Sequence, residues 1–252
     1  MPADTSRRRS NRERVAARRA AEAAARARAE RNRRTLLGAI AGGVVVLVAL
    51  VVVILVQTHR TSTSASAAVP AHTVGGTAIV VGSAGAPVTV DLYEDLQCPN
   101  CKAFEDQTGQ TLAQLVAAGT VQAHYHPMAF LDNATNNKYS TRALNAAAAV
   151  LDTAGSTAFQ KFHDLLYANQ PPETGTGLTD AQLIAYAHQA GATSSKVDTD
   201  IKNLTFGDWV KTVTDQASKD GVTATPTVLV KGKTLSDLSP AGLTAAVDAA
   251  KG

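Results

Sequence analysis

The first strong hydrophobic pattern in the chain is an uninterrupted apolar run at residues 36–56, which contains no charged side chain. A helix of about 20 apolar residues, rising about 1.5 Å per residue, spans the roughly 30 Å hydrocarbon core of a bilayer. A secretory signal peptide has a shorter apolar core of about 7–15 residues. A possible cleavage site, Ala65-Ser66-Ala67, also lies well beyond the run. We therefore predict a retained transmembrane helix at 35–57 rather than a cleaved leader.

From residue 74 onwards, short strand-like patterns alternate with longer helix-like ones. Strands are predicted at 77–81, 88–93, 121–126 and 227–230. Helices are predicted at 98–118, 138–153 and 157–168, from Thr179, within 198–219 with a break near Gly207, and at 239–251. This order predicts an α/β domain with an inserted helical subdomain at about 138–220, because a minimal crossover between two strands needs only one helix.

Charge is distributed unevenly along the chain. The tail at 1–34 contains twelve arginines and four acidic residues, a net charge of +8, and since the whole chain carries +3, the remainder carries −5. Positive charge marks the cytoplasmic side of a membrane helix, so we expect a single-pass cell-membrane protein with a cytoplasmic N-terminus. The simplest interpretation of the tail is that it is a topology signal, which could also contact anionic lipid. We predict no nucleic-acid binding, because no aromatic residue is interleaved with the arginines.

A stretch rich in Ser, Thr and Ala at 58–73 is typical of a flexible linker. We therefore expect residues 74–252 to form an extracytoplasmic domain. Disulfides form and persist in that environment, which gives any thiol pair in the domain a redox context.

Cys98 and Cys101 are the only cysteines, in the sequence Cys-Pro-Asn-Cys. A disulfide scaffold needs more cysteines, and one pair supplies only half of a tetrahedral zinc site. The pair follows a predicted strand and opens a predicted helix, which is the arrangement of a thioredoxin-like redox site. Inert or metal-bound thiols are the alternatives.

The position of each residue in the pair suggests its role. At a helix N-terminus, unpaired N–H groups and the helix dipole lower the pKa of the Cys98 thiol. Pro99 falls at the first helical position, where its missing N–H costs nothing, and Asn100 adds no positive charge. Cys101, on the same face one turn later, is expected to be more buried and to resolve a mixed disulfide.

Four stretches, 85–90, 94–105, 159–166 and 221–227, together resemble the DsbA-like branch of the thioredoxin superfamily, over about residues 74–252. The resemblance implies a thioredoxin-like fold with a helical insertion and thiol–disulfide oxidoreductase activity. It also implies exported protein substrates with thiols or disulfides. Turnover requires a membrane redox partner. We expect no cofactor and no metal.

Thr225 and Pro226 resemble the cis-proline loop of this family, which lies beside the reactive cysteine and pairs with an extended substrate peptide. We therefore predict a cis peptide bond at this position and a substrate-binding role for both residues. The alternative is an ordinary trans proline that opens a strand.

The sequence departs from the family pattern near the pair. Many relatives carry a buried acid six residues before the first cysteine, as a proton acceptor near the resolving thiol, and here that residue is Leu92. Glu94 and Asp95 are closer and are expected to be exposed. Asn100 replaces the histidine of the family's strong oxidants. Proton transfer at Cys101 and the direction of redox traffic therefore stay open.

Other residues offer competing chemistry. His124 and His126 share one face of a predicted strand, so they are candidates for a copper or zinc site with the cysteines. No sequence feature brings the two groups together, and we expect His163 and Trp209 to be packing or surface residues. Three functions remain: a thiol oxidase that forms disulfides in exported proteins, a reductase or isomerase of the same fold, and a non-catalytic metal- or peptide-binding module. We favour the first.

Overall fold

The structure is a computed structural model, and it describes residues 68–133 and 135–251. The predicted tail, the predicted transmembrane helix at 35–57 and linker residues 58–67 lie outside the described residues. Within the part of the chain that is described, no helix is long and apolar enough to cross a membrane.

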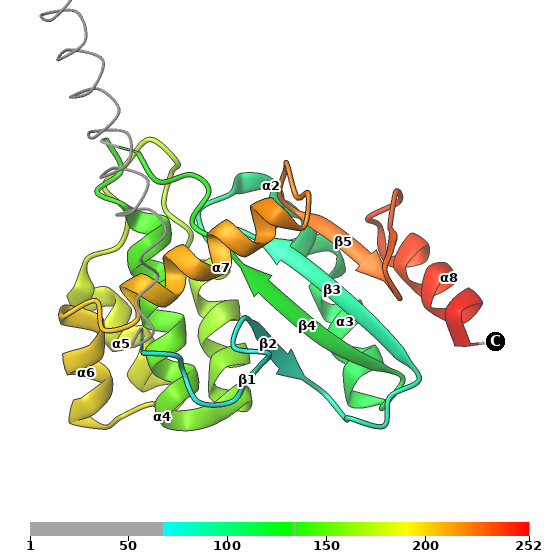
Figure 1. Cartoon of the computed structure of the whole chain (residues 1–252), viewed down its shortest axis with the longest axis horizontal. Helices are drawn as coiled ribbons and strands as arrows, with labels where there is room; N and C mark the ends of the chain where they lie inside the picture. Colours follow the sequence, from blue (N-terminus) through cyan, green and yellow to red (C-terminus); the bar gives the residue numbers. More distant parts are fainter. Residues whose placement is uncertain (1–67, 134, 252) are drawn as a thin grey trace, which may run out of the picture. The chain divides into compact units, whose positions relative to one another are not determined.

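A six-stranded sheet forms the centre of the described chain, in the order β1-β2-β4-β3-β5-β6 (Figure 1). Its strands are β1 (Thr73–Val74), β2 (Ala78–Val81), β3 (Val88–Glu94), β4 (Val121–Pro127), β5 (Thr227–Val230) and β6 (Lys233–Thr234). Only β3 and β4 are parallel; the other neighbouring pairs of the described sheet are antiparallel. The four predicted strands are confirmed, whereas β1 and β6 were missed because two residues are too few to show an alternating pattern.

The helices also follow the predicted order. They are α2 (Pro99–Phe104), the π-helical segment η1 (Glu105–Gly109), α3 (Gln110–Ala117), α4 (Tyr139–Ala168), α5 (Asp180–Ala190), α6 (Ser195–Lys202), α7 (Gly207–Lys219) and α8 (Pro240–Lys251). The predicted helix at 98–118 is thus continuous but contains an unpredicted π-helical turn, and a left-handed Gly119 (φ 70°) follows it.

Helices α4 to α7 lie between β4 and β5 in the chain. Gly155 (φ 76°, ψ −177°) interrupts α4 between the two helices predicted there. Helix α5 opens with a capping box, in which Thr179 and Gln182 satisfy each other's backbone N–H groups. Trp209 of α7 is buried, which is the packing alternative of the two expected for it, and its indole N–H donates to the Gly76 carbonyl at 2.7 Å.

The two faces of the sheet differ sharply. On β3, Val88, Val90 and Leu92 are buried and share a hydrophobic core with residues of α3, α4 and α8. The alternate residues of β3 are only half-buried and point to the opposite face. On that face Tyr93 reaches the end of α7, where its hydroxyl donates to Asp220 at 3.4 Å. Ionisable side chains therefore lie on both faces of the sheet.

Candidate active site

The two cysteines lie where β3 leads into α2. Cys98 is the N-cap of α2, with extended backbone angles (φ −72°, ψ 120°), and Pro99 is the first helical residue. The Cys98 carbonyl accepts the first helical hydrogen bond, from the Lys102 N–H at 3.1 Å. Both thiols are free; Cys98 is 6% exposed and Cys101 1%. The predicted order of burial within the pair is confirmed.

The two thiols have opposite electrostatic environments. The pKa of Cys98 is lowered to about 5, chiefly by a hydrogen bond from the Cys101 thiol and also by the backbone N–H groups of Cys101 and Asn100, while burial opposes the shift. The pKa of Cys101 is raised far above its ordinary value by that same hydrogen bond, by burial and by the charge of Glu94. At neutral pH the pair therefore holds one thiolate, on Cys98, and one thiol, on Cys101.

The loop before β5 approaches the first cysteine from the other side. The Thr225–Pro226 peptide bond is cis, as predicted. The Cys98 sulfur lies 3.5 Å from the Thr225 carbonyl oxygen, to which the thiol donates when it is protonated. The structure thus brings together two segments that are 127 residues apart in the sequence.

The expectation that Asp95 is exposed is wrong, because its side chain is completely buried. Its carboxylate accepts hydrogen bonds from the Gln97 N–H (2.8 Å), the Leu131 N–H (2.9 Å) and the Ser140 hydroxyl (2.7 Å). Burial raises the pKa of Asp95 to about 6, although these bonds oppose the shift. Asp95 thereby fastens the loop before the cysteines to the start of α4.

Gln170, which lies just after α4, also holds the loop before the cysteines in place. Its side-chain amide donates to the Leu96 carbonyl at 3.0 Å and to the Cys98 carbonyl at 3.1 Å. The position of Cys98 therefore depends on residues more than 70 positions away in the sequence, which no local pattern reveals.

The expectation for Glu94 is also wrong, because this side chain is only 2% exposed. Glu94 Oε1 lies 2.7 Å from Nε2 of His163, and the Tyr167 hydroxyl donates to Oε2 at 3.3 Å. Although burial opposes it, the pKa of His163 is raised well above its ordinary value by Glu94, Asp164 and Glu105. His163 is therefore the buried partner of a carboxylate and more than a packing residue.

A second carboxylate, Glu105, completes this buried group. Ligand-type atoms of Glu94, Glu105 and His163 all lie within 4.8 Å of one another. Burial raises the pKa of Glu105 to about 7, and its Oε1 has no hydrogen-bond partner within the described chain. Strand alternation was the missed signal: Glu94 follows the buried Val90 and Leu92 on the same face of β3.

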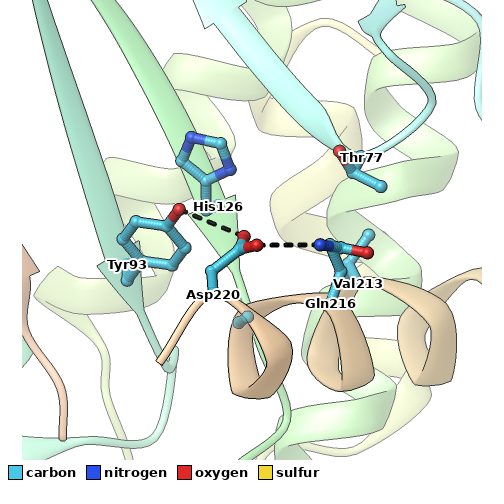
Figure 2. Close-up of a pocket in the computed structure, with 7 residues that line it drawn as sticks. Thr77, Tyr93, His126, Val213, Gln216 and Asp220 are labelled. Carbon is cyan, nitrogen blue, oxygen red and sulfur yellow. Dashed lines mark hydrogen bonds between the residues drawn. The ribbon is translucent and has the colours of Figure 1, made fainter. Parts of the chain in front are cut away.

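The predicted histidines lie on the other face of the sheet. Within the described residues, His124 and His126 form no cluster with the cysteines, so a shared site of these four residues is not present. His126 stacks on Tyr93, with 4.5 Å between ring centroids, beside a pocket that Asp220 and Gln216 also line (Figure 2). Burial, followed by the charges of Asp220 and Asp91, raises the pKa of Tyr93 to about 12.

A sequence profile described as thioredoxin matches residues 74–249. The chain is 36% identical to reduced disulfide bond oxidoreductase DsbG of Mycobacterium tuberculosis, with a TM-score of 0.63 and coverage of 70% of this chain and 88% of DsbG. It is 34% identical to reduced DsbA of the same organism, with a TM-score of 0.60 and coverage of 69% and 98%. This chain belongs to the thioredoxin family, in its DsbA-like branch of thiol–disulfide oxidoreductases.

Curated relatives of this DsbA-like chain include disulfide bond formation protein D of Bacillus subtilis, which is 28% identical over 164 residues, covering 64% of this chain and 70% of that protein. The chain is also 32% identical over 118 residues to the serine/threonine-protein kinase PknE of M. tuberculosis. That match covers 45% of this chain and spans only 21% of the kinase. The family resemblance and the thioredoxin-like α/β fold predicted from the motifs are confirmed.

Proposed function

We propose that this DsbA-like protein introduces disulfides into exported proteins, with Cys98 as the reactive cysteine. The opposing pKa shifts of the pair carry the proposal. A pKa of about 5 at Cys98 lies between about 7 for thioredoxin and about 3.5 for DsbA. A stabilised thiolate favours the reduced pair, and a pair that is stable when reduced is a strong oxidant of other thiols.

The reaction starts from the Cys98–Cys101 disulfide. A substrate thiolate attacks the Cys98 sulfur, so that a substrate–Cys98 bond forms and the Cys98–Cys101 bond breaks, and Cys101 leaves and takes up a proton. A second substrate thiolate then attacks the substrate sulfur of the mixed disulfide and expels Cys98 as a thiolate. The substrate loses two electrons and the pair gains them. The low pKa of Cys98 favours its expulsion by the second substrate thiolate, because a thiol of lower pKa leaves faster.

The buried carboxylates beside Cys101 support the proton step. Cys101 requires a proton when it leaves, because its pKa is raised, and Glu94 is one of the charges that raise it. Glu105, with a pKa of about 7, lies in the same cluster and can hold a proton at neutral pH. We assign Glu94 to positioning and Glu105 to proton supply, in place of the acid that Leu92 replaces.

Substrate binding is assigned to the loop at Thr225 and Pro226. The Thr225 carbonyl is 3.5 Å from the Cys98 sulfur, so a peptide strand that pairs with this loop brings its own cysteine against Cys98. Pro99 and Asn100 complete the motif, since Pro99 begins α2 and the Asn100 N–H supports the thiolate.

We further propose that the domain is held outside the cytoplasm by a helix at residues 36–56, with the basic tail inside. The length of the apolar run and the charge of +8 before it support this topology. A membrane redox partner then removes the two electrons after each turnover.

The reduction potential of the Cys98–Cys101 pair tests the proposed direction. The full-length protein is equilibrated in glutathione buffers, and free thiols are counted by alkylation. We expect about −120 to −180 mV, the range of disulfide-forming and isomerising relatives, whereas about −270 mV would make the protein a reductase. A pair that does not titrate reversibly would remove the redox function altogether.

A further inference from the structure

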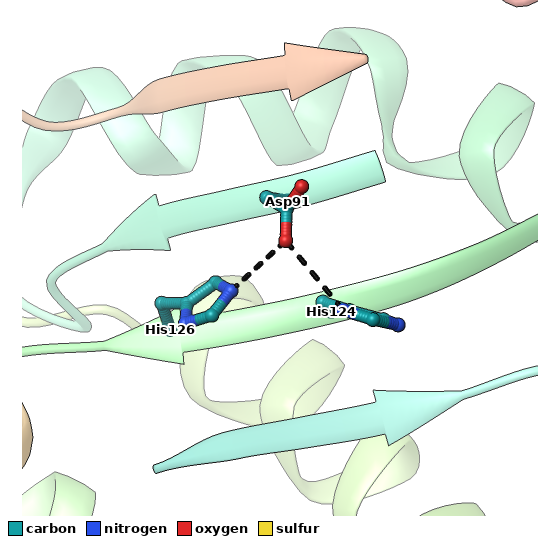
Figure 3. Close-up of side chains that lie close together, drawn as sticks. All are labelled: Asp91, His124 and His126. Carbon is teal, nitrogen blue, oxygen red and sulfur yellow. Dashed lines mark hydrogen bonds and ion pairs between the residues drawn. The ribbon is translucent and has the colours of Figure 1, made fainter. Parts of the chain in front are cut away.

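Three metal-ligand side chains converge on the sheet face opposite the core. Asp91 extends from β3, His124 and His126 extend from β4, and the Asp91 carboxylate points at both rings (Figure 3). Asp91 Oδ1 lies 3.1 Å from His126 Nε2 and 3.5 Å from His124 Nδ1. We propose that these three residues bind a divalent transition-metal ion, namely Zn²⁺.

Strand register builds the cluster. Asp91 is the direct partner of His124 in the parallel β3–β4 pair, and His126 lies two residues further on the same face. A tetrahedral ion with bonds of about 2.0–2.1 Å separates its ligand atoms by about 3.3–3.4 Å. The two measured separations, 3.1 and 3.5 Å, fall on either side of that distance. All three ligand atoms also lie within 4.8 Å of one another.

Neighbouring side chains already orient both rings. Nε2 of His124 lies 2.9 Å from the Gln122 amide oxygen, which leaves Nδ1 free to face Asp91. Such an acceptor behind a histidine is the usual outer-shell support of a metal ligand. His126 is stacked on Tyr93 with an angle of 13° between the rings, which fixes its plane.

The donor set and its exposure suggest the kind of ion. Two imidazole nitrogens and one carboxylate oxygen suit zinc and copper, whereas calcium and magnesium prefer oxygen ligands throughout. The three side chains are 20–24% exposed, so an ion has access from solvent and keeps an open position for water. Among the described residues, Asp91 pairs with no lysine or arginine that would compete with a cation.

Zinc titration of the full-length, untagged protein tests this site. Both cysteines are first replaced by serine (C98S/C101S), so that thiols do not bind the ion. Calorimetry is expected to show one Zn²⁺ per chain. Loss of an outer-shell partner costs about 10–100-fold in affinity, so Gln122→Ala is expected to weaken binding about 10-fold and Asp91→Asn or His126→Gln at least about 100-fold.

His188→Gln is the matched control, because His188 also pairs with an aspartate, Asp198, at 2.7 Å but has no third ligand among the residues that the structure describes. It is expected to leave zinc affinity unchanged. Thermal unfolding in chelator verifies that each variant folds, and added zinc should raise the midpoint of the parent but not of Asp91→Asn.

Two outcomes would overturn the site. If the cysteine-free parent does not bind zinc, Asp91, His124 and His126 form only an ion-paired group and no metal site. Binding that survives Asp91→Asn at parental affinity, but is lost in Glu105→Gln, would assign the ion to the buried Glu94–Glu105–His163 group instead. Neither result depends on the redox activity of the pair, so this site and the proposed function are tested separately.

Discussion

Glu94 and His163 form a buried ion pair whose carboxylate charge acts on Cys101, with 2.7 Å between Oε1 and Nε2 and at most 3% of either side chain exposed. Tyr125, Phe159 and Tyr167 surround the imidazole with their rings, so water does not compensate for the loss of either partner. The pair therefore links the stability of the fold to the electrostatics of Cys101, whose pKa Glu94 helps to raise.

Replacing Glu94 by glutamine is expected to destabilise the protein by about 3 kcal/mol, because removing one partner of a buried pair leaves the other uncompensated. It should also make Cys101 more reactive, because a negative charge near its sulfur is lost. Urea unfolding measures the first effect, and alkylation of Cys101 in a Cys98→Ser background measures the second. His188→Gln, which breaks a pair whose histidine is 40% exposed, should cost at most about 1 kcal/mol. Equal losses in the two variants would contradict the buried-pair argument.

The same pair has a defined pH dependence. The pKa of His163 is raised in the folded protein, so its stabilising contribution is complete below the ordinary histidine pKa of about 6.5 and is lost as the pH rises through the folded value. We therefore expect the difference in unfolding free energy between wild type and Glu94→Gln to shrink at high pH. A difference that grows with pH would contradict the assigned charge state.

Cys98 should produce the opposite pH dependence in the reduced protein. Its pKa falls from about 9 to about 5 on folding, so the unfolded chain binds more protons between these values and stability rises with pH. This contribution is complete above about pH 9 and is lost as the pH falls through about 5. Unfolding of the reduced protein and of Cys98→Ser should therefore diverge from pH 5 to 8. Parallel profiles would mean that Cys98 is not a thiolate.

Replacing Cys101 by serine should trap the first covalent intermediate. Cys98 then exchanges with an oxidised small-molecule or peptide disulfide, but no neighbouring thiol resolves the mixed disulfide. Mass spectrometry should find one adduct per chain in Cys101→Ser and none in Cys98→Ser. An adduct on Cys101 in the Cys98→Ser variant at a similar rate would reverse the roles, which the 1% exposure of Cys101 argues against.

Gly177 is expected to be irreplaceable for a steric reason. Its φ is 74°, and a Cβ added there would overlap the buried ring of Tyr139. Gly191 has a φ of 107° but no atom within 4 Å of an added Cβ, so it isolates the cost of backbone strain. We expect Gly191→Ala to cost about 1–2 kcal/mol and Gly177→Ala a further 1–3 kcal/mol, approximately, from overpacking. Equal midpoints in thermal unfolding would mean that Tyr139 moves aside freely.

Several features of this protein depend only on neighbours along the chain, and the sequence was sufficient to predict them. Hydrophobic alternation predicted strands β2 to β5, helical periodicity predicted the helices, and Cys98-Pro-Asn-Cys101 predicted a thiol pair at the start of a helix. Each of these features arises from local backbone preference, which a short window of residues records. The motifs were also sufficient to predict the family to which the chain belongs.

Which polar residues meet depends instead on how the elements pack in three dimensions. Glu94 and Asp95 looked exposed because two acids beside a loop usually face water, yet α4 covers both with His163 and Ser140. His124 and His126 shared a face in the sequence, but their third partner, Asp91, depends on the register between β3 and β4. Packing and register join residues that are 33 to 69 positions apart, and no local pattern encodes such distances.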